Sequence, residues 1–147
     1  MDLKEIVSSC LYDGSWDSEA KAENERNFLK ARRKLNKDFV IRYGENNGYQ
    51  GWWLDGLEVW RTDWAMKQSA MLCLHLKKQE EKIDLMFCGV DGLSLRGDLQ
   101  PAGSRWAAEI RLMAFQELQG ELHCAVACRE GFTLRMKFKQ VAIQEKT

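Results

Sequence analysis

The sequence has a single proline, Pro101, and no segment with the composition of a linker or a low-complexity tract. It also has no long apolar run, whereas a membrane-spanning helix needs about 20 consecutive apolar residues. Internal repeats with a period of about 20–50 residues are absent as well. These absences predict one continuous domain over residues 1–147 and no association with a membrane.

Neither sign of charge is in excess, because 22 basic residues balance 22 acidic residues. Domains that bind nucleic acid usually carry a basic excess, so we predict that this chain does not bind nucleic acid. The motifs of several enzyme classes are also missing: there is no phosphate-binding glycine loop, no nucleophile elbow and no HExxH run. The sequence therefore favours a protein that is not an enzyme.

The five cysteines cannot all pair within the chain, because their number is odd. Asp2 and Glu5 lie where a secretory signal would be basic. Reduced thiols and the lack of a signal predict a cytoplasmic protein. On an extended strand, Cys124 and Cys128 would lie about 13 Å apart, too far for one zinc ion or a disulfide. We expect no metal and no other cofactor.

The first part of the chain has a helical pattern. Asp2 can cap a short helix that ends near Leu11. Asp17 or the following serine can cap a second helix that extends to about Asn36, with acidic residues early and basic residues late, as the helix dipole favours. We therefore predict a helical part over residues 1–37.

From Phe39 onward, apolar and polar residues alternate with a period of two, which is typical of strands with one buried face. The alternating runs are FVIRY, AMLCLHLK, KIDLMF, LSL, EIRLMAF and FTLRMKFK. Short turns separate these runs and favour antiparallel pairing of neighbours. The sequence predicts a mainly β domain: residues 38–147 form an antiparallel meander of about seven or eight strands. We expect a strongly curved sheet or a barrel, with one or two amino-terminal helices packed on it.

Four of the six tryptophans lie in the seventeen residues Gly48–Trp64. If Asp55-Gly56 is a two-residue hairpin turn, Trp52 lies on the core face of the hairpin. The opposite face then carries Tyr49, Trp53, Glu58 and Trp60. We predict that this second face binds a ligand or a partner, because rigid aromatic side chains give a large contact area. The alternative is that the amino-terminal helix covers it.

The hairpin at Glu130-Gly131 allows two registers. In one register His123 faces the core, and a slip of one residue turns Cys124, Val126 and Cys128 inward instead. Both faces of this strand are apolar, which predicts a strand covered on both sides. His123 is a candidate pocket residue.

Cys73 and His75 lie on the same face of a predicted strand. A cysteine beside a histidine can act as a nucleophile, but the sequence reveals no third residue that would orient this histidine.

The first hypothesis for function is a non-catalytic binding protein that takes a small hydrophobic or aromatic ligand in an apolar groove or a barrel interior. The second is a protein-interaction module (an adaptor, chaperone or immunity-type protein) that uses the aromatic face, with a second copy of the chain as one candidate partner. The third is a small enzyme that uses Cys73 and His75, or His123.

Overall fold

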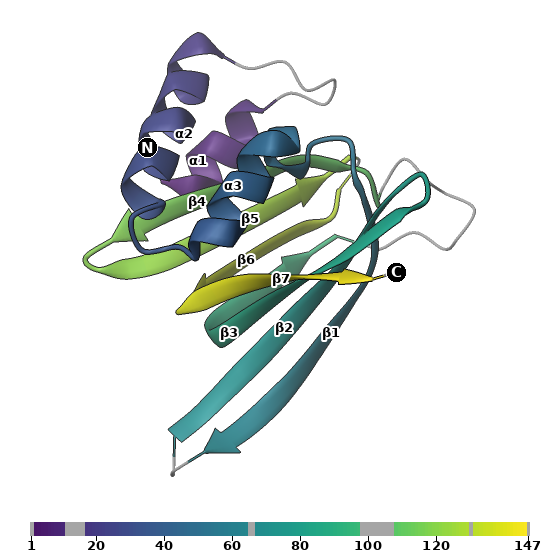
Figure 1. The fold of residues 1–147 in the computed structure, drawn as a ribbon. Helices are drawn as coiled ribbons and strands as arrows, with labels where there is room; N and C mark the ends of the chain where they lie inside the picture. The colour runs from purple at the N-terminus through teal and green to yellow at the C-terminus, as the bar shows by residue number, and fades with distance from the viewer. Residues whose placement is uncertain (1, 11–16, 65–66, 98–107, 130, 147) are drawn as a thin grey trace.

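The computed structural model describes residues 2–10, 17–64, 67–97, 108–129 and 131–146. Helices gather at one end of a curved antiparallel sheet (Figure 1). The helical segments are α1 (Leu3–Ser9), α2 (Ser18–Ala31), α3 (Lys37–Glu45) and the short 3-10 helix η1 (Asn47–Tyr49). The strands are β1 (Trp53–Trp64), β2 (Lys67–Lys78), β3 (Glu81–Arg96), β4 (Ile110–Leu118), β5 (Glu121–Cys128), β6 (Thr133–Phe138) and β7 (Gln140–Lys146). The predicted mainly β architecture with amino-terminal helices is confirmed, and every strand pair is antiparallel.

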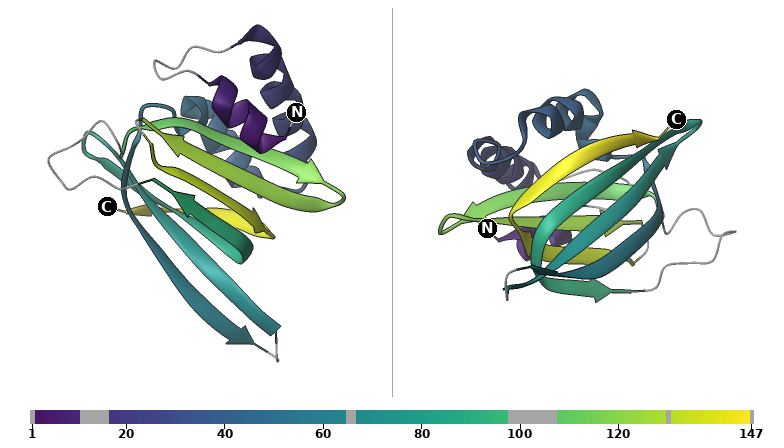
Figure 2. Two further views of the ribbon diagram at one scale, coloured as in Figure 1. Left: turned by 180° about the vertical axis from the view of Figure 1, so that it is seen from behind. Right: turned by 60° about the horizontal axis from the view of Figure 1, so that its bottom comes forward.

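The long strand β3 joins two halves of the sheet. The strand order is β1-β2-β3-β6-β5-β4, and β7 also pairs with β3. The first part of β3 pairs with β2 and β7, while its last part pairs with β6. Between these two parts of β3, Gly89 and Gly92 have φ angles of 63° and 60°. Residues with a side chain disfavour this left-handed region, and the strand changes direction at these two glycines. The bend gives the sheet its strong curvature, as both views in Figure 2 show.

The sheet curves far enough for its two outer strands to meet at one corner. Ile110 at the start of β4 donates to the carbonyl of Trp52 and accepts from Gly51, at 2.7 and 2.9 Å. A single bridge between Trp53 and Glu109 follows. Beyond that corner β1 and β4 separate, so the sheet is not a closed barrel.

Helices cover both faces of β4 and β5. On one face, Phe28 of α2 and Tyr43 of α3 pack against Phe115, with ring centroids 6.2 and 5.6 Å apart. On the other face, α1 packs against Leu112, Ala114, Ala125 and Ala127. In the right-hand view of Figure 2, α2 and α3 lie above these strands and α1 lies below them. The prediction that the strand of His123 is covered on both sides is confirmed.

The main core fills the space between the concave face of the sheet and helices α2 and α3. It includes Trp52, which is 2% exposed, as the sequence predicts. Burial of aromatic side chains such as that of Trp52 supplies a large share of the stabilising hydrophobic area. No helix within the described residues is both long enough and apolar enough to cross a membrane.

The prediction of a strand at FVIRY is wrong, because these residues form α3. Phe39 and Tyr43 are spaced by four, so they fit one face of a helix as well as one face of a strand. The side chain of Asn36 accepts a hydrogen bond from the amide of Asp38 at 2.9 Å and caps the helix. Ile41, expected on the core face, is exposed. The helical part therefore extends beyond residue 37 to Tyr49.

The predicted hairpin at Asp55-Gly56 is also wrong. Residues 53–64 form one continuous strand, and its partner is β2. The pairing shifts between Leu54 and Gly56, so Asp55 is an extra residue in a β-bulge. Side chains alternate on either side of the bulge. Because Asp55 is an extra residue, the side chain of Trp53 lies on the same face of the sheet as those of Glu58 and Trp60.

In the hairpin of β5 and β6 the slipped register is the observed one. His123 pairs with Lys137 and Ala125 pairs with Arg135. Cys124, Val126 and Cys128 face the main core, so His123 lies on the opposite face of the sheet.

Candidate functional site

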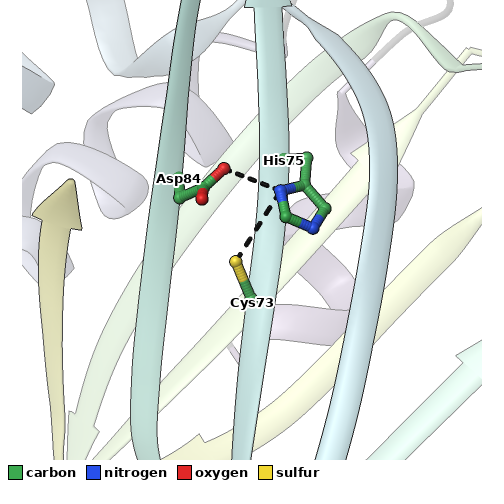
Figure 3. A group of neighbouring side chains, drawn as sticks. All are labelled: Cys73, His75 and Asp84. Atoms are coloured by element: carbon green, nitrogen blue, oxygen red, sulfur yellow. Dashed lines mark hydrogen bonds and ion pairs between the residues drawn. The ribbon is translucent and has the colours of Figure 1, made fainter. Parts of the chain in front are cut away.

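Cys73, His75 and Asp84 form a compact polar cluster on the face of β2 and β3 that points away from the main core (Figure 3). Nδ1 of His75 lies 2.7 Å from Oδ1 of Asp84 and 3.8 Å from Sγ of Cys73. One donor atom from each residue lies within 4.8 Å of the other two. Cys73 and Asp84 are buried and His75 is half-buried, so the histidine connects the cluster with solvent.

The hairpin between β2 and β3 places these three side chains together. Lys78 pairs with Glu81 across the turn, and Gln79 adopts a φ of 55° there. Each step away from the turn advances one residue on both strands, so His75 lies opposite Asp84. Cys73 is two residues before His75 and shares its face. Asp84 is the third residue that the sequence analysis did not find.

The hydrogen-bonding geometry disfavours a relay of the kind found in cysteine hydrolases. In such a relay the histidine contacts the nucleophile through one ring nitrogen and the orienting carboxylate through the other. Here both Cys73 and Asp84 face Nδ1 of His75. The other ring nitrogen, Nε2, lies 3.7 Å from Oε1 of Glu58 on β1. Sulfur, nitrogen and oxygen donors that converge on one point are instead the arrangement of a metal-ligand set.

A second polar site lies on the outer face of β3, β4, β5 and β6, beside the start of α1. Strand pairing sets Gln116, His123, Lys137 and Asp91 in one row, and Ala114, Ala125, Arg135 and Ser94 in the next row. The alanines Ala114 and Ala125 pack against α1, and the row with the larger polar side chains borders the first residues of α1. The resulting cleft, which we call the α1 cleft, has a volume of about 390 Å³.

The α1 cleft is lined by the cations Lys4, Arg135 and Lys137 and by the anions Asp2 and Asp91. Lys137 lies 3.5 Å from Asp91 and 3.4 Å from Glu121, so its charge is balanced. The described part of the chain gives Arg135 no comparable carboxylate. Burial lowers the pKa of His123, with Glu121 opposing and Lys137 adding to this effect. His123 is therefore mainly neutral at pH 7, and its ring can both donate and accept a hydrogen bond.

The predicted site residues separate into three places. Trp53, Glu58 and Trp60 share the outer face of β1, next to His75 and Cys73. Tyr49 is 1% exposed and packs edge-on against Trp52 in the core, so it does not belong to that face. His123 lines the α1 cleft on the other half of the sheet.

Comparison of the chain with models of known protein families and with curated proteins finds no match in either.

Proposed function

We propose that the chain is a non-catalytic, cytoplasmic binding protein and that its ligand occupies the α1 cleft. The observation that carries this proposal is the cleft volume of about 390 Å³ together with its polar and apolar lining. Sites for small molecules typically measure about 300–1,000 Å³ and combine apolar walls with a few polar groups. The five free cysteines support the cytoplasmic location.

The lining favours a small ligand with an aromatic or other apolar body and one anionic group. Leu3 and Leu118 provide apolar contacts. Arg135 offers a guanidinium, which binds carboxylates through two parallel hydrogen bonds. The neutral ring of His123 can accept or donate one further hydrogen bond.

A titration followed by amide NMR of the full-length protein tests this proposal. The probes are 1-naphthoate and its uncharged counterpart 1-naphthalenemethanol. We expect naphthoate to shift resonances of β4–β6 and of α1, and the alcohol to bind more weakly. Arg135→Gln should weaken naphthoate binding about tenfold, because a charge-assisted hydrogen bond at a partly exposed site contributes about 1.5 kcal/mol.

Lys139→Gln is the matched control, since Lys139 is an exposed cation outside the α1 cleft. Its affinity for naphthoate should equal that of the wild-type protein. Shifts confined to another region, or equal weakening by both substitutions, would contradict the α1 cleft as the ligand site.

A second candidate function is self-association through β1, which the exposure of two apolar side chains favours. Val59 is 45% exposed and Trp60 is 38% exposed. β1 pairs with β2 along one side, and on its other side the described residues contribute only the corner bridge to Glu109. A second copy of the chain could extend the sheet along this edge, since antiparallel pairing of two identical strands is two-fold symmetric. Light scattering should then report a dimer that Val59→Lys converts to a monomer, and a monomeric wild-type protein would eliminate this candidate.

A further inference from the structure

We propose that Cys73, His75 and Asp84 form a binding site for a divalent transition metal ion of the zinc type. This site lies on the outer face of β2 and β3 and is independent of the α1 cleft, which is formed by other strand segments. The proposal rests on donor type, donor geometry and the surroundings of His75.

The donor types select the class of ion. A thiolate, an imidazole and a carboxylate together suit zinc and its neighbours in the first transition series. Calcium and magnesium prefer oxygen donors only, so a site with one sulfur and one nitrogen disfavours both.

The donor geometry fits a tetrahedral ion after a small adjustment. Bonds of about 2.0–2.3 Å place neighbouring donors roughly 3.3–3.6 Å apart. Sγ of Cys73 lies 3.8 Å from Nδ1 of His75, close to that spacing. Oδ1 of Asp84 lies 2.7 Å from the same nitrogen, so this pair must separate by roughly 0.6 Å to admit the ion. A small rotation of the Asp84 side chain provides that movement.

One ring nitrogen, Nδ1 of His75, faces both neighbouring donor groups. If Nδ1 of His75 carries a proton, it can donate to Asp84 and cannot accept from Cys73. If Nδ1 is bare, it can accept from Cys73, while its lone pair repels the carboxylate of Asp84. A cation between the three donors attracts all of them at once.

Glu58 completes the arrangement from the outer side. Histidine ligands commonly donate their second ring N–H to a carboxylate, which fixes the tautomer and the ring orientation. Nε2 of His75 lies 3.7 Å from Oε1 of Glu58, on the side away from Cys73 and Asp84, so the exposed Glu58 side chain must move slightly closer to accept this hydrogen bond. Protonation at Nε2 leaves Nδ1 as the ligand atom, as the proposed site requires. Three protein ligands leave a fourth position for water or another small ligand.

A titration of the full-length, chelator-treated protein with Co²⁺ tests the proposal. Co²⁺ is a spectroscopic substitute for Zn²⁺, and a cobalt–thiolate bond gives a charge-transfer band in the near ultraviolet. We expect this band to saturate at one ion per chain and Zn²⁺ to abolish it by displacement. Cys73→Ser should remove the band, and His75→Gln or Asp84→Asn should weaken Co²⁺ binding at least about tenfold. Glu58→Ala should weaken binding about tenfold while keeping the band, because Glu58 does not contact the ion.

Cys88→Ser is the matched control, because Cys88 is a half-buried thiol on the same strand as Asp84 and outside the cluster. This variant should keep the band and the affinity. A wild-type protein without the band would overturn the proposal whatever the variants do. A band that survives Cys73→Ser but is lost in Cys88→Ser would also overturn it, since the ion would then be bound elsewhere.

If Cys73→Ser does not fold, the wild-type protein still decides the matter. Long-range ¹H–¹⁵N NMR of the histidine rings distinguishes a metal-bound Nδ1 from a metal-bound Nε2. Zn²⁺ should change the Nδ1 resonance of His75 and leave the ring of His123 unaffected. A change at His123 alone would contradict the site.

Discussion

His75 and Asp84 lie directly opposite each other on β2 and β3, with Nδ1 and Oδ1 only 2.7 Å apart. Asp84 is 5% exposed, so its carboxylate has little access to water. A buried carboxylate is tolerated when hydrogen bonds compensate for its lost hydration. The histidine therefore contributes to stability even without a bound ion, and it links a buried acid to the surface.

We predict that His75→Ala lowers the free energy of unfolding by about 1–3 kcal/mol in metal-free buffer, because it removes one hydrogen-bond partner of a buried acid. A double-mutant cycle with Asp84→Ala should give a coupling energy of about 0.5–3 kcal/mol from urea denaturation. His123→Ala is the control for the loss of a half-buried histidine. His123 lies in the α1 cleft, where burial lowers its pKa, and not beside Asp84. A coupling energy near zero would mean that the short contact between His75 and Asp84 contributes nothing.

The register of the β2–β3 hairpin could have been read from the sequence. Counting back from the turn at Lys78 and Glu81 pairs His75 with Asp84 without any structural information. Arg135 in the α1 cleft could not be found in this way. Its neighbour Ser94 lies on β3, and the chain passes through β4 and β5 before it returns as β6. Local patterns do not determine which distant strands become neighbours.

Two elements were predicted wrongly because the local sequence pattern is compatible with more than one structure. Phe39 and Tyr43 satisfy a helix and a strand equally well, and the cap at Asn36 together with packing against Phe115 selects the helix. Asp55-Gly56 fits a hairpin turn, but it also fits a bulge inside a long strand. Trp53, Glu58 and Trp60 were placed on one face from the sequence by assuming a hairpin turn at Asp55-Gly56. The structure has no turn there, but the extra residue of the bulge places the same three side chains on one face.

The two tryptophans Trp52 and Trp60 should respond differently to truncation. Trp52 is 2% exposed, so Trp52→Ala should lower the free energy of unfolding by about 3–5 kcal/mol through the cavity that it leaves. Trp60 is 38% exposed on β1, and Trp60→Ala should change stability by about 1 kcal/mol or less. Chemical denaturation of both variants provides the measurement. Similar large losses would indicate that Trp60 is part of a packed interior.

Stability should fall at alkaline pH because two buried thiols resist ionisation in the folded state. Burial raises the pKa of Cys128 from 9.0 to about 12, with Arg111 opposing, and burial also raises the pKa of Cys124. Below about pH 9 both thiols are protonated whether the chain is folded or not. Above that pH the unfolded chain loses these protons and the folded chain keeps them, so the free energy of unfolding decreases as pH rises toward the folded-state values.

Each thiol should contribute a slope of about 1.4 kcal/mol per pH unit above its unfolded pKa. Above pH 10 Tyr49 adds to the decline, because burial raises its pKa from 10.0 to about 12. Urea denaturation between pH 8 and 11 measures the slope, and Cys128→Ala should reduce it by the contribution of one proton. An unchanged slope in that variant would show that Cys128 ionises as readily in the folded protein as in the unfolded chain.

Gly97 should be the least replaceable glycine near the junction of β3 and β6. It has a φ of 84°, and a Cβ atom there would clash with the carbonyl oxygen of Gly131. That oxygen belongs to the backbone, so the clash can be relieved only if the chain before β6 moves. Gly92 has a similar φ of 60°, but a Cβ atom on it would meet no atom within 4 Å.

The two substitutions therefore separate steric clash from backbone strain. Gly92→Ala should lower the free energy of unfolding by about 1–2 kcal/mol, the penalty for an alanine in the left-handed region. Gly97→Ala should lose the same amount and, in addition, the free energy needed to displace the segment before β6. Guanidinium denaturation of the two variants measures the difference, and hydrogen exchange should locate the added loss at the pairing of Arg96 with Thr133. Equal losses would mean that the segment before β6 moves aside without resistance, and the close approach of Gly97 to Gly131 would then not constrain the sheet.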